Sequence, residues 1–223
     1  MTPETLHQNQ PVLHAGEDLA RARAGAILLH GRGASAADIL AISDYLRFPG
    51  LAWLAPEAAG NVWYPERHFA PLETNEPALS SAFQVIEQLI GGLMGRGIPA
   101  ERIFFGGFSQ GACISTEFAF RHVRRWGGIF VFSGSFMGPA ESASIGIGEG
   151  SFAGTPVLVA CGDPDPYFDT PSVQRTATMF RARGAAVEEL IVPGIGHAIG
   201  DEALDLASAI LERALGEGAP AGA

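Results

Sequence analysis

The segment that most constrains this chain runs from Ile103 to Cys113, where an apolar stretch leads through Gly107-Phe108-Ser109-Gln110-Gly111 into a helical pattern. A serine in a sharp strand–turn–helix connection has a strained backbone, and its hydroxyl is lifted clear of the sheet. Flanking glycines let the strand and the helix pass closely without a Cβ clash. The serine also precedes a helix, whose unpaired N–H groups favour developing negative charge. We therefore predict that Ser109 is a nucleophile.

Length and hydrophobic content indicate how the chain is organised. At 223 residues with 47% hydrophobic content, it suits a single α/β domain over residues 1–215, followed by a disordered tail at 216–223. No apolar run approaches the roughly 18 residues of a membrane span, and the N-terminus lacks the pattern of a signal peptide. We therefore expect a cytoplasmic protein without stable membrane insertion. The sequence does not decide the oligomeric state, and a homodimer is one alternative.

Charge and cysteine usage exclude several classes of function. The net charge of −10 argues against binding a nucleic-acid backbone. All 14 basic residues are arginine, which excludes Schiff-base chemistry and a phosphate-binding Walker lysine. Cys113 and Cys161 lie in apolar runs and are expected to be buried free thiols. No cluster has the spacing of a metal site, so we expect neither a metal nor a cofactor.

Strand-like and helical patterns alternate along the chain, which predicts a mostly parallel sheet with helices on both faces. Residues 1–11 are expected to be a loose arm, and Val12–Gly16 a short edge strand. The remaining strands are expected at 24–30, 51–55, 102–107, 128–132, 156–161 and 187–192, and the helices at 36–47, 78–94, 110–123, 172–183 and 201–215. Ligands gather beyond the carboxyl ends of such strands. We expect the polar residues just after strands to converge there, namely His30, Ser109, Ser133, Asp163, Asp165 and His197.

A serine nucleophile needs a general base, and His197 is the best candidate among six histidines. It follows the last predicted strand on a glycine-rich loop. His30 is expected to hold the loop that follows its own strand. His68 lies in the long irregular loop at 57–77, either at the surface or lining a pocket.

An anion is needed to orient the histidine and to stabilise its charged form. Asp163, Asp165 and Asp169 compete for this role, and the chain order Ser–Asp–His suits all three. Spacing does not separate Asp163 from Asp165, and either could be a turn aspartate that bonds its own backbone. Asp163 is nearer the strand end and better placed to brace the turn, which favours Asp165.

The tetrahedral intermediate of acyl transfer carries an oxyanion that paired backbone N–H groups stabilise. One donor is expected from Gln110, the residue after the serine, and the other from the loop after the early strand. The stretch His30-Gly31-Arg32-Gly33 fits that second place, with Arg32 donating through its N–H group.

Together, Leu29–Gly33, Gly106–Ala112, Gly162–Pro166 and Gly196-His197 resemble the phospholipase/carboxylesterase family, which includes acyl-protein thioesterases and small bacterial carboxylesterases. The resemblance spans residues 24–215 and implies an α/β-hydrolase fold without a sizeable lid domain. It implies Ser109 as nucleophile, Asp165 rather than Asp163 as acid and His197 as base. It also implies that the Arg32 and Gln110 N–H groups form the oxyanion hole.

The chain departs from the family pattern at two places, because Cys161 stands where a histidine is usual and Tyr167-Phe168 replace small aliphatic residues. We expect neither departure to touch the triad. The apolar residues expected around the pocket are Trp63, Tyr64, Phe69, Phe136, Met137 and Ile199.

The expected function is a serine carboxylesterase acting on small-molecule esters of short to medium chain length. An acyl thioesterase or lysophospholipase is the alternative within the enzyme class. A non-catalytic binding protein on the same fold is the alternative outside that class.

Overall fold

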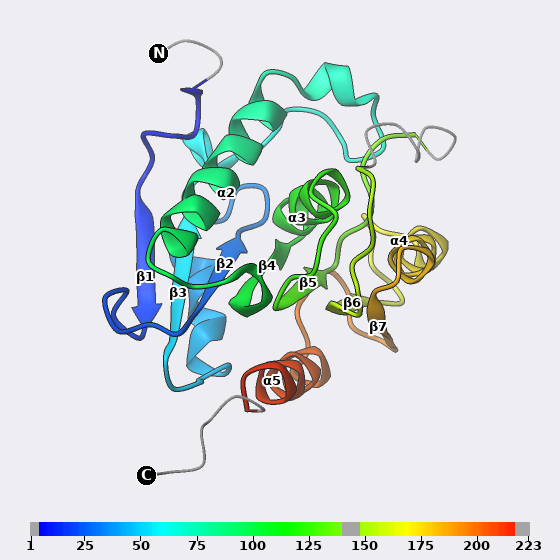
Figure 1. Cartoon of the computed structure of the whole chain (residues 1–223). Coiled ribbons are helices and arrows are strands. Elements are labelled where there is room, and N and C mark those ends of the chain that lie inside the picture. The colour runs from blue at the N-terminus through cyan, green and yellow to red at the C-terminus, as the bar shows by residue number, and fades with distance from the viewer. Residues whose placement is uncertain (1–4, 140–147, 217–223) are drawn as a thin grey trace.

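The computed structural model describes residues 5–139 and 148–216, so most of the tail expected at 216–223 lies outside the described residues. Its centre is a seven-stranded sheet of order β1-β3-β2-β4-β5-β6-β7 (Figure 1). The strands are β1 Val12–Gly16, β2 Ala24–Leu29, β3 Leu51–Pro56, β4 Ile103–Phe108, β5 Gly128–Phe132, β6 Pro156–Gly162 and β7 Ala186–Val192. β1 pairs antiparallel with β3, and every other neighbouring pair is parallel. The mostly parallel sheet predicted from the sequence is confirmed.

In the described residues, four α-helices connect strands and a fifth follows β7: α1 Ala36–Leu40, α2 Ala78–Met94, α3 Gln110–Arg121, α4 Thr170–Ala182 and α5 Asp201–Gly216. The first is shorter than the helix predicted over 36–47. Ser35 and Asp38 form a reciprocal capping box at its start. After Leu40 the backbone tightens into a 3₁₀ turn, Ala41–Asp44. Pro49 and Gly50, the latter at φ 81°, then turn the chain into β3.

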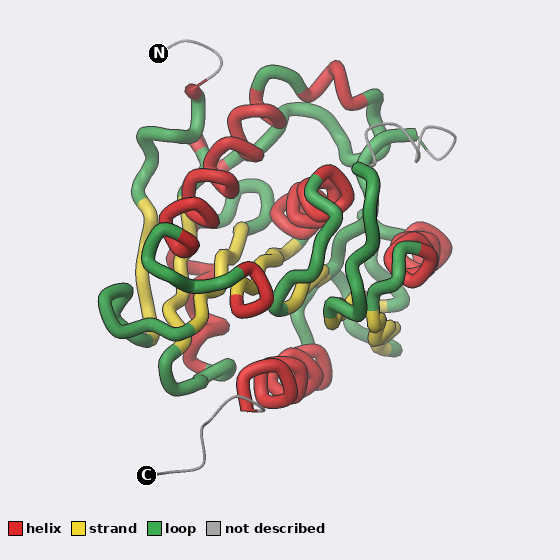
Figure 2. The backbone as a smooth tube through the Cα atoms, viewed as in Figure 1, coloured by secondary structure: helices red, strands yellow, loops and turns green. Residues whose placement is uncertain are grey.

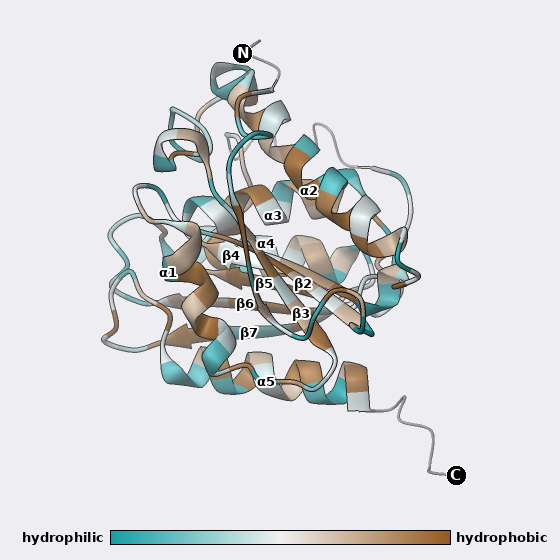
Figure 3. Cartoon of the chain, turned by 90° about the vertical axis from the view of Figure 1, so that its left-hand side faces the viewer, coloured by the Kyte–Doolittle hydropathy of each residue, from teal (hydrophilic) through white to brown (hydrophobic). Residues whose placement is uncertain are grey.

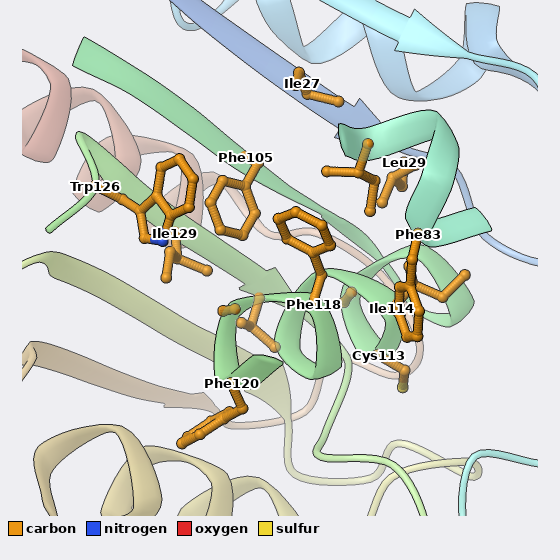
Figure 4. Close-up of a cluster of buried hydrophobic side chains, with 14 of the residues drawn as sticks. Ile27, Leu29, Phe83, Phe105, Cys113, Ile114, Phe118, Phe120, Trp126 and Ile129 are labelled. Atoms are coloured by element: carbon orange, nitrogen blue, oxygen red, sulfur yellow. The ribbon is translucent and has the colours of Figure 1, made fainter. Parts of the chain in front are cut away.

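Helices cover both faces of the sheet. α2, α3 and α4 pack on one face, and α1 and α5 pack on the other (Figures 1 and 3). All residues of β2 and β3 are buried, as expected where both faces of a strand are covered. On the α3 side, Phe105 meets Phe118 and Trp126 edge-on, with ring centroids 5.6 and 5.2 Å apart (Figure 4). Such edge-on pairs add to the stabilisation from burial alone.

The connection from β3 to α2 runs mainly as loop, with short 3₁₀ turns at Ala59–Asn61 and Leu72–Asn75 (Figure 2). The N-terminal arm is fixed against this loop, so the expectation of a loose arm is wrong for its described part. His7 is only 2% exposed; its Nδ1 accepts from the Ala59 N–H at 3.0 Å, and its Nε2 lies 3.0 Å from the Trp63 carbonyl oxygen. Within the described residues, no helix is both long enough and apolar enough to cross a membrane.

Candidate active site

Ser109 lies at the sharp turn between β4 and α3, with φ 54° and ψ −116°. A positive φ is costly for a residue with a side chain, and the turn is held by the Ser109 N–H, which donates to the Phe132 carbonyl at 2.9 Å. A Cβ at Gly107 or at Gly111 would lie 2.3 or 2.2 Å from the Leu29 carbonyl oxygen. The two glycines therefore let β2 approach the turn closely enough to support it.

The three residues predicted to form a triad lie in a hydrogen-bonded row. Ser109 Oγ is 2.8 Å from His197 Nε2, and His197 Nδ1 is 2.7 Å from Asp165 Oδ2. An ionised carboxylate only accepts hydrogen bonds, so Nδ1 carries the proton and Nε2 is free to accept from the hydroxyl. This geometry allows a proton to pass from Ser109 to His197 while Asp165 stabilises the resulting positive charge.

Asp165 has the environment of an ionised group, although its side chain is fully buried. Burial raises the pKa of this carboxyl, but the hydrogen bond from His197 and the N–H groups of Tyr167 and Phe168 outweigh burial and leave it below the usual value. The two N–H groups donate to Oδ1 at 2.8 and 3.2 Å. The Asp165 carboxylate is therefore charged and fixed in orientation at neutral pH.

The structure separates the three aspartates that spacing left open. Asp163 is exposed and accepts a hydrogen bond from the Gly194 N–H at 2.8 Å, so it braces the turn between two loops. Asp169 caps α4 by accepting from the Ser172 N–H. Of the three, Asp165 is the one that contacts His197.

Arg32 and Gln110, the residues predicted to form an oxyanion hole, line the same cavity as Ser109 and His197. Their side chains reach away to the β3–α2 loop. The Gln110 amide accepts from the Trp63 N–H at 2.8 Å and donates to the Tyr64 carbonyl at 2.7 Å. The Arg32 guanidinium donates to the same carbonyl at 2.8 Å. Among the described residues, neither backbone N–H group donates to a protein acceptor, so both remain available to a ligand.

His30 is buried and has a structural place. Its Nδ1–H donates to the Gly31 carbonyl at 2.8 Å, and its Nε2 accepts from the Ala58 N–H at 3.1 Å. The His30 carbonyl also accepts from Trp63 Nε1 at 3.1 Å. His30 therefore ties the turn that carries Arg32 to the β3–α2 loop, as the sequence predicted.

Two cavities lie side by side at this edge of the sheet. One of about 520 Å³ is lined by Ser109 and His197, and one of about 470 Å³ is lined by Phe69, Phe136 and residues at the start of α4. His68, Tyr167 and Phe168 line both, and the His68 ring stacks on Phe168 at 4.5 Å. Burial lowers the pKa of His68 to about 4, so this stack is uncharged at neutral pH.

The six predicted pocket residues fall into two groups. Tyr64 lines the first cavity, and Phe69 and Phe136 line the second. Trp63 and Met137 instead belong to the buried core on the α3 side, and Ile199 packs against the core under α5. An aromatic or aliphatic residue in a loop close to an active site can point into the core as readily as into a pocket, and the sequence does not show which.

Cys161, Tyr167 and Phe168 all contact residues of the predicted triad, so the expectation that these departures do not touch it is wrong. The Tyr167 and Phe168 rings lie 4.8 and 5.9 Å from the His197 ring. Cys161 Sγ lies 3.5 Å from Asp165 Oδ2. The sequence could have indicated the contacts of Tyr167 and Phe168, because these two residues follow Asp165 almost directly in the chain.

Nothing in the described part of the chain suggests a metal centre. Over residues 5–139 and 148–216, no three or more histidine, cysteine, aspartate or glutamate side chains are grouped so that they could hold a metal ion.

Comparison with known proteins agrees with this architecture. The family model described as phospholipase/carboxylesterase matches residues 14–214. A phospholipase/carboxylesterase from Dyadobacter fermentans has a similar crystal structure, with a TM-score of 0.86 and 37% identity over 91% of this chain and 97% of that one. An acyl-protein thioesterase 1 from Eremothecium gossypii is 29% identical over 87% of this chain and 89% of its own length. The crystal structure of esterase PE8 has a TM-score of 0.75 and 25% identity, covering 92% of this chain and 98% of that one.

The fold and these similarities define an esterase or thioesterase of the α/β-hydrolase superfamily. More narrowly, the chain belongs to the phospholipase/carboxylesterase family, as its sequence motifs indicated.

Proposed function

We propose that this protein is a serine carboxylesterase that hydrolyses short- to medium-chain esters through a covalent acyl-enzyme. The observation that carries the proposal is the unbroken row of hydrogen bonds from Ser109 through His197 to Asp165, opening into a cavity of about 520 Å³. The Tyr64, Tyr167 and Phe168 rings at this cavity suit an apolar acyl chain of limited length.

In the proposed reaction the Ser109 oxygen attacks the ester carbonyl carbon while His197 Nε2 takes the hydroxyl proton. The oxyanion that forms accepts hydrogen bonds from the Arg32 and Gln110 N–H groups, each typically worth about 100- to 1,000-fold in rate. His197 then gives its proton to the alcohol oxygen as the C–O bond breaks. Water, activated by the same imidazole, hydrolyses the acyl-enzyme and regenerates the Ser109 hydroxyl.

Hydrolysis of p-nitrophenyl butyrate by a Ser109→Ala variant tests the mechanism. We expect kcat to fall by on the order of 10⁶, and labelling by a fluorophosphonate to disappear. Ser115→Ala is a matched control, because Ser115 lies on the same helix and its buried hydroxyl has no hydrogen-bond partner among the described residues. Turnover retained by the Ser109 variant would end the proposal.

A thioesterase is the second candidate, favoured by the similarity to the Eremothecium gossypii acyl-protein thioesterase 1. Both bonds would be cleaved by the same residues, so the triad does not separate them. Values of kcat/KM for p-nitrophenyl butyrate and for a palmitoyl thioester, measured side by side on one preparation, decide between them. A higher value for the palmitoyl thioester would replace the carboxylesterase assignment.

A further inference from the structure

The thiol of Cys161 lies next to the carboxylate of the proposed triad. Cys161 is near the end of β6, is 3% exposed, and places Sγ 3.5 Å from Asp165 Oδ2. Burial, reinforced by the negative charge of Asp165, raises the pKa of Cys161 to about 12. The sulfur therefore keeps its proton at neutral pH and can donate it in a hydrogen bond.

The hydrogen bonds to Asp165 leave no free accepting position on its carboxylate. A carboxylate offers about four lone-pair sites on its two oxygens. Oδ1 accepts from the Tyr167 and Phe168 N–H groups, and Oδ2 accepts from His197 Nδ1 and from the Cys161 thiol. Rotation of the carboxylate would break bonds on both oxygens, so the four donors together fix the direction in which Oδ2 faces His197.

The end of β6, which carries Cys161, is held in place by Ser133. The Ser133 N–H donates to the carbonyl of Ala160, the residue before Cys161, at 2.7 Å. The Ser133 hydroxyl donates to the carbonyl of Ala198, the residue after His197, at 3.4 Å. Ser133 is fully buried and has φ 44°, a conformation that persists only where the surroundings enforce it. The ends of β5 and β6 and the loop that carries His197 are thus joined at Ser133.

We propose that Cys161 is a positioning residue of the active site, whose S–H group donates to Asp165 Oδ2 and holds the carboxylate in line with His197. This rests on the proposed function, because it assigns a role within the Ser109–His197–Asp165 row. Cys161 does not touch the reacting atoms and acts through Asp165.

Loss of the thiol should change the pH dependence of kcat/KM, which a packing defect at the same position would not do. Without this donor, more of the negative charge on Oδ2 faces His197 and favours the protonated imidazole, which is inactive as a base. The acidic limb of the kcat/KM profile should therefore move to higher pH. Cys161 does not line the cavity that holds Ser109 and His197, so kcat should fall while KM changes little.

The first experiment compares Cys161→Ala, Cys161→Ser and Cys113→Ala on p-nitrophenyl butyrate across pH. We expect Cys161→Ala to lose about three- to tenfold in kcat and the acidic limb of its kcat/KM profile to lie at higher pH than that of the wild type. Cys161→Ser keeps a donor and should fall between Cys161→Ala and the wild type. Cys113→Ala removes the other buried thiol, on α3, and should leave the limb in place. A Cys161→Ala profile equal to that of the wild type, or identical displaced profiles for both Cys161 variants, would overturn the proposal.

The second experiment needs no turnover. In the Cys113→Ala protein Cys161 is the remaining thiol of the sequence, so the infrared S–H stretching band reports on it alone. We expect the band at lower frequency than that of a thiol in an apolar solvent, and a shift upward when Asp165→Asn removes the negative acceptor. A band at the free-thiol position, or one that Asp165→Asn leaves unmoved, would refute the hydrogen bond. These results are independent of the test of the proposed function, which would be refuted by retained activity of the Ser109→Ala variant.

Discussion

The close approach of β2 to α3 makes Gly111 a position where alanine, ordinarily the better helix former, should destabilise the protein. A Cβ there would lie 2.2 Å from the Leu29 carbonyl oxygen and 2.5 Å from its carbonyl carbon. β2 lies between β3 and β4 in the sheet, so Leu29 has no room to retreat. Strand and helix would have to separate by about 1 Å to reach ordinary contact.

The expected magnitude follows from two opposing terms. Replacing glycine by alanine inside a helix normally gains about 1 kcal/mol, whereas overpacking a core costs about 1–3 kcal/mol and occasionally more. Because the clash is with the main chain of a buried strand, we expect the upper end of that cost to prevail. Gly111→Ala should therefore lower the free energy of unfolding by about 2 kcal/mol and Tm by about 4–8 °C.

Urea unfolding followed by tryptophan fluorescence measures this, with Gly91→Ala as the control. Gly91 lies in α2, is exposed, and a Cβ there would meet nothing within 4 Å. Gly91→Ala should therefore stabilise the protein by about 0.5–1 kcal/mol. If Gly111→Ala proved as stable as Gly91→Ala, the close approach of β2 would not constrain the turn, and the reasoning about the Ser109 backbone would be wrong.

Two further predictions concern histidines outside the proposed triad. The folded protein holds the pKa of His68 at about 4 against 6.5 in the unfolded chain, so the unfolded state binds the proton first and stability falls as pH drops through 6.5 towards 4. Between about pH 7.5 and about pH 5 this should remove about 1–2 kcal/mol, allowing for partial exposure. His68→Phe keeps a ring on Phe168 and should show a Tm drop over this range smaller by about 2–4 °C; an equal drop would contradict the assignment. His7→Ala leaves the Ala59 N–H and the Trp63 carbonyl without their partner and should cost about 2–4 kcal/mol in urea unfolding, whereas His14→Ala, at an exposed position, should change stability by less than about 0.5 kcal/mol.

Much of the fold was predictable because its signals are local. Apolar runs of strand length alternate with helical patterns, and the strands found at Ala24–Leu29, Leu51–Pro56 and Gly128–Phe132 match those runs closely. Parallel order follows from the same alternation. The helix predicted over 36–47 is shorter than expected because periodicity alone does not show where α-helix gives way to a 3₁₀ turn.

The candidate site divides in the same way. The place of Ser109 and Gln110 at the turn between β4 and α3 was predictable, because that turn is built from neighbouring residues, each with its own backbone requirement. The wall of the pocket was not, because Trp63 and Tyr64 are adjacent in sequence and yet only Tyr64 lines the cavity. The direction in which a loop side chain points depends on which other parts of the chain pack against that loop.

By itself, the sequence determined the order of the elements, the sharp turn at Ser109 and the family of the protein, since each of these depends on residues a few positions apart. The sequence favoured Asp165 over Asp163, but only the tertiary structure decided that Asp165 contacts His197. It alone also decided that Cys161 donates to that carboxylate and that His7 is buried against the loop after β3. Some of these contacts join segments that are far apart in the sequence. Others depend on which of two residues close in sequence, such as Asp163 and Asp165, points its side chain towards His197. The distances between the contacting atoms are set by how the strands and loops pack together, and no local pattern of residues encodes these distances.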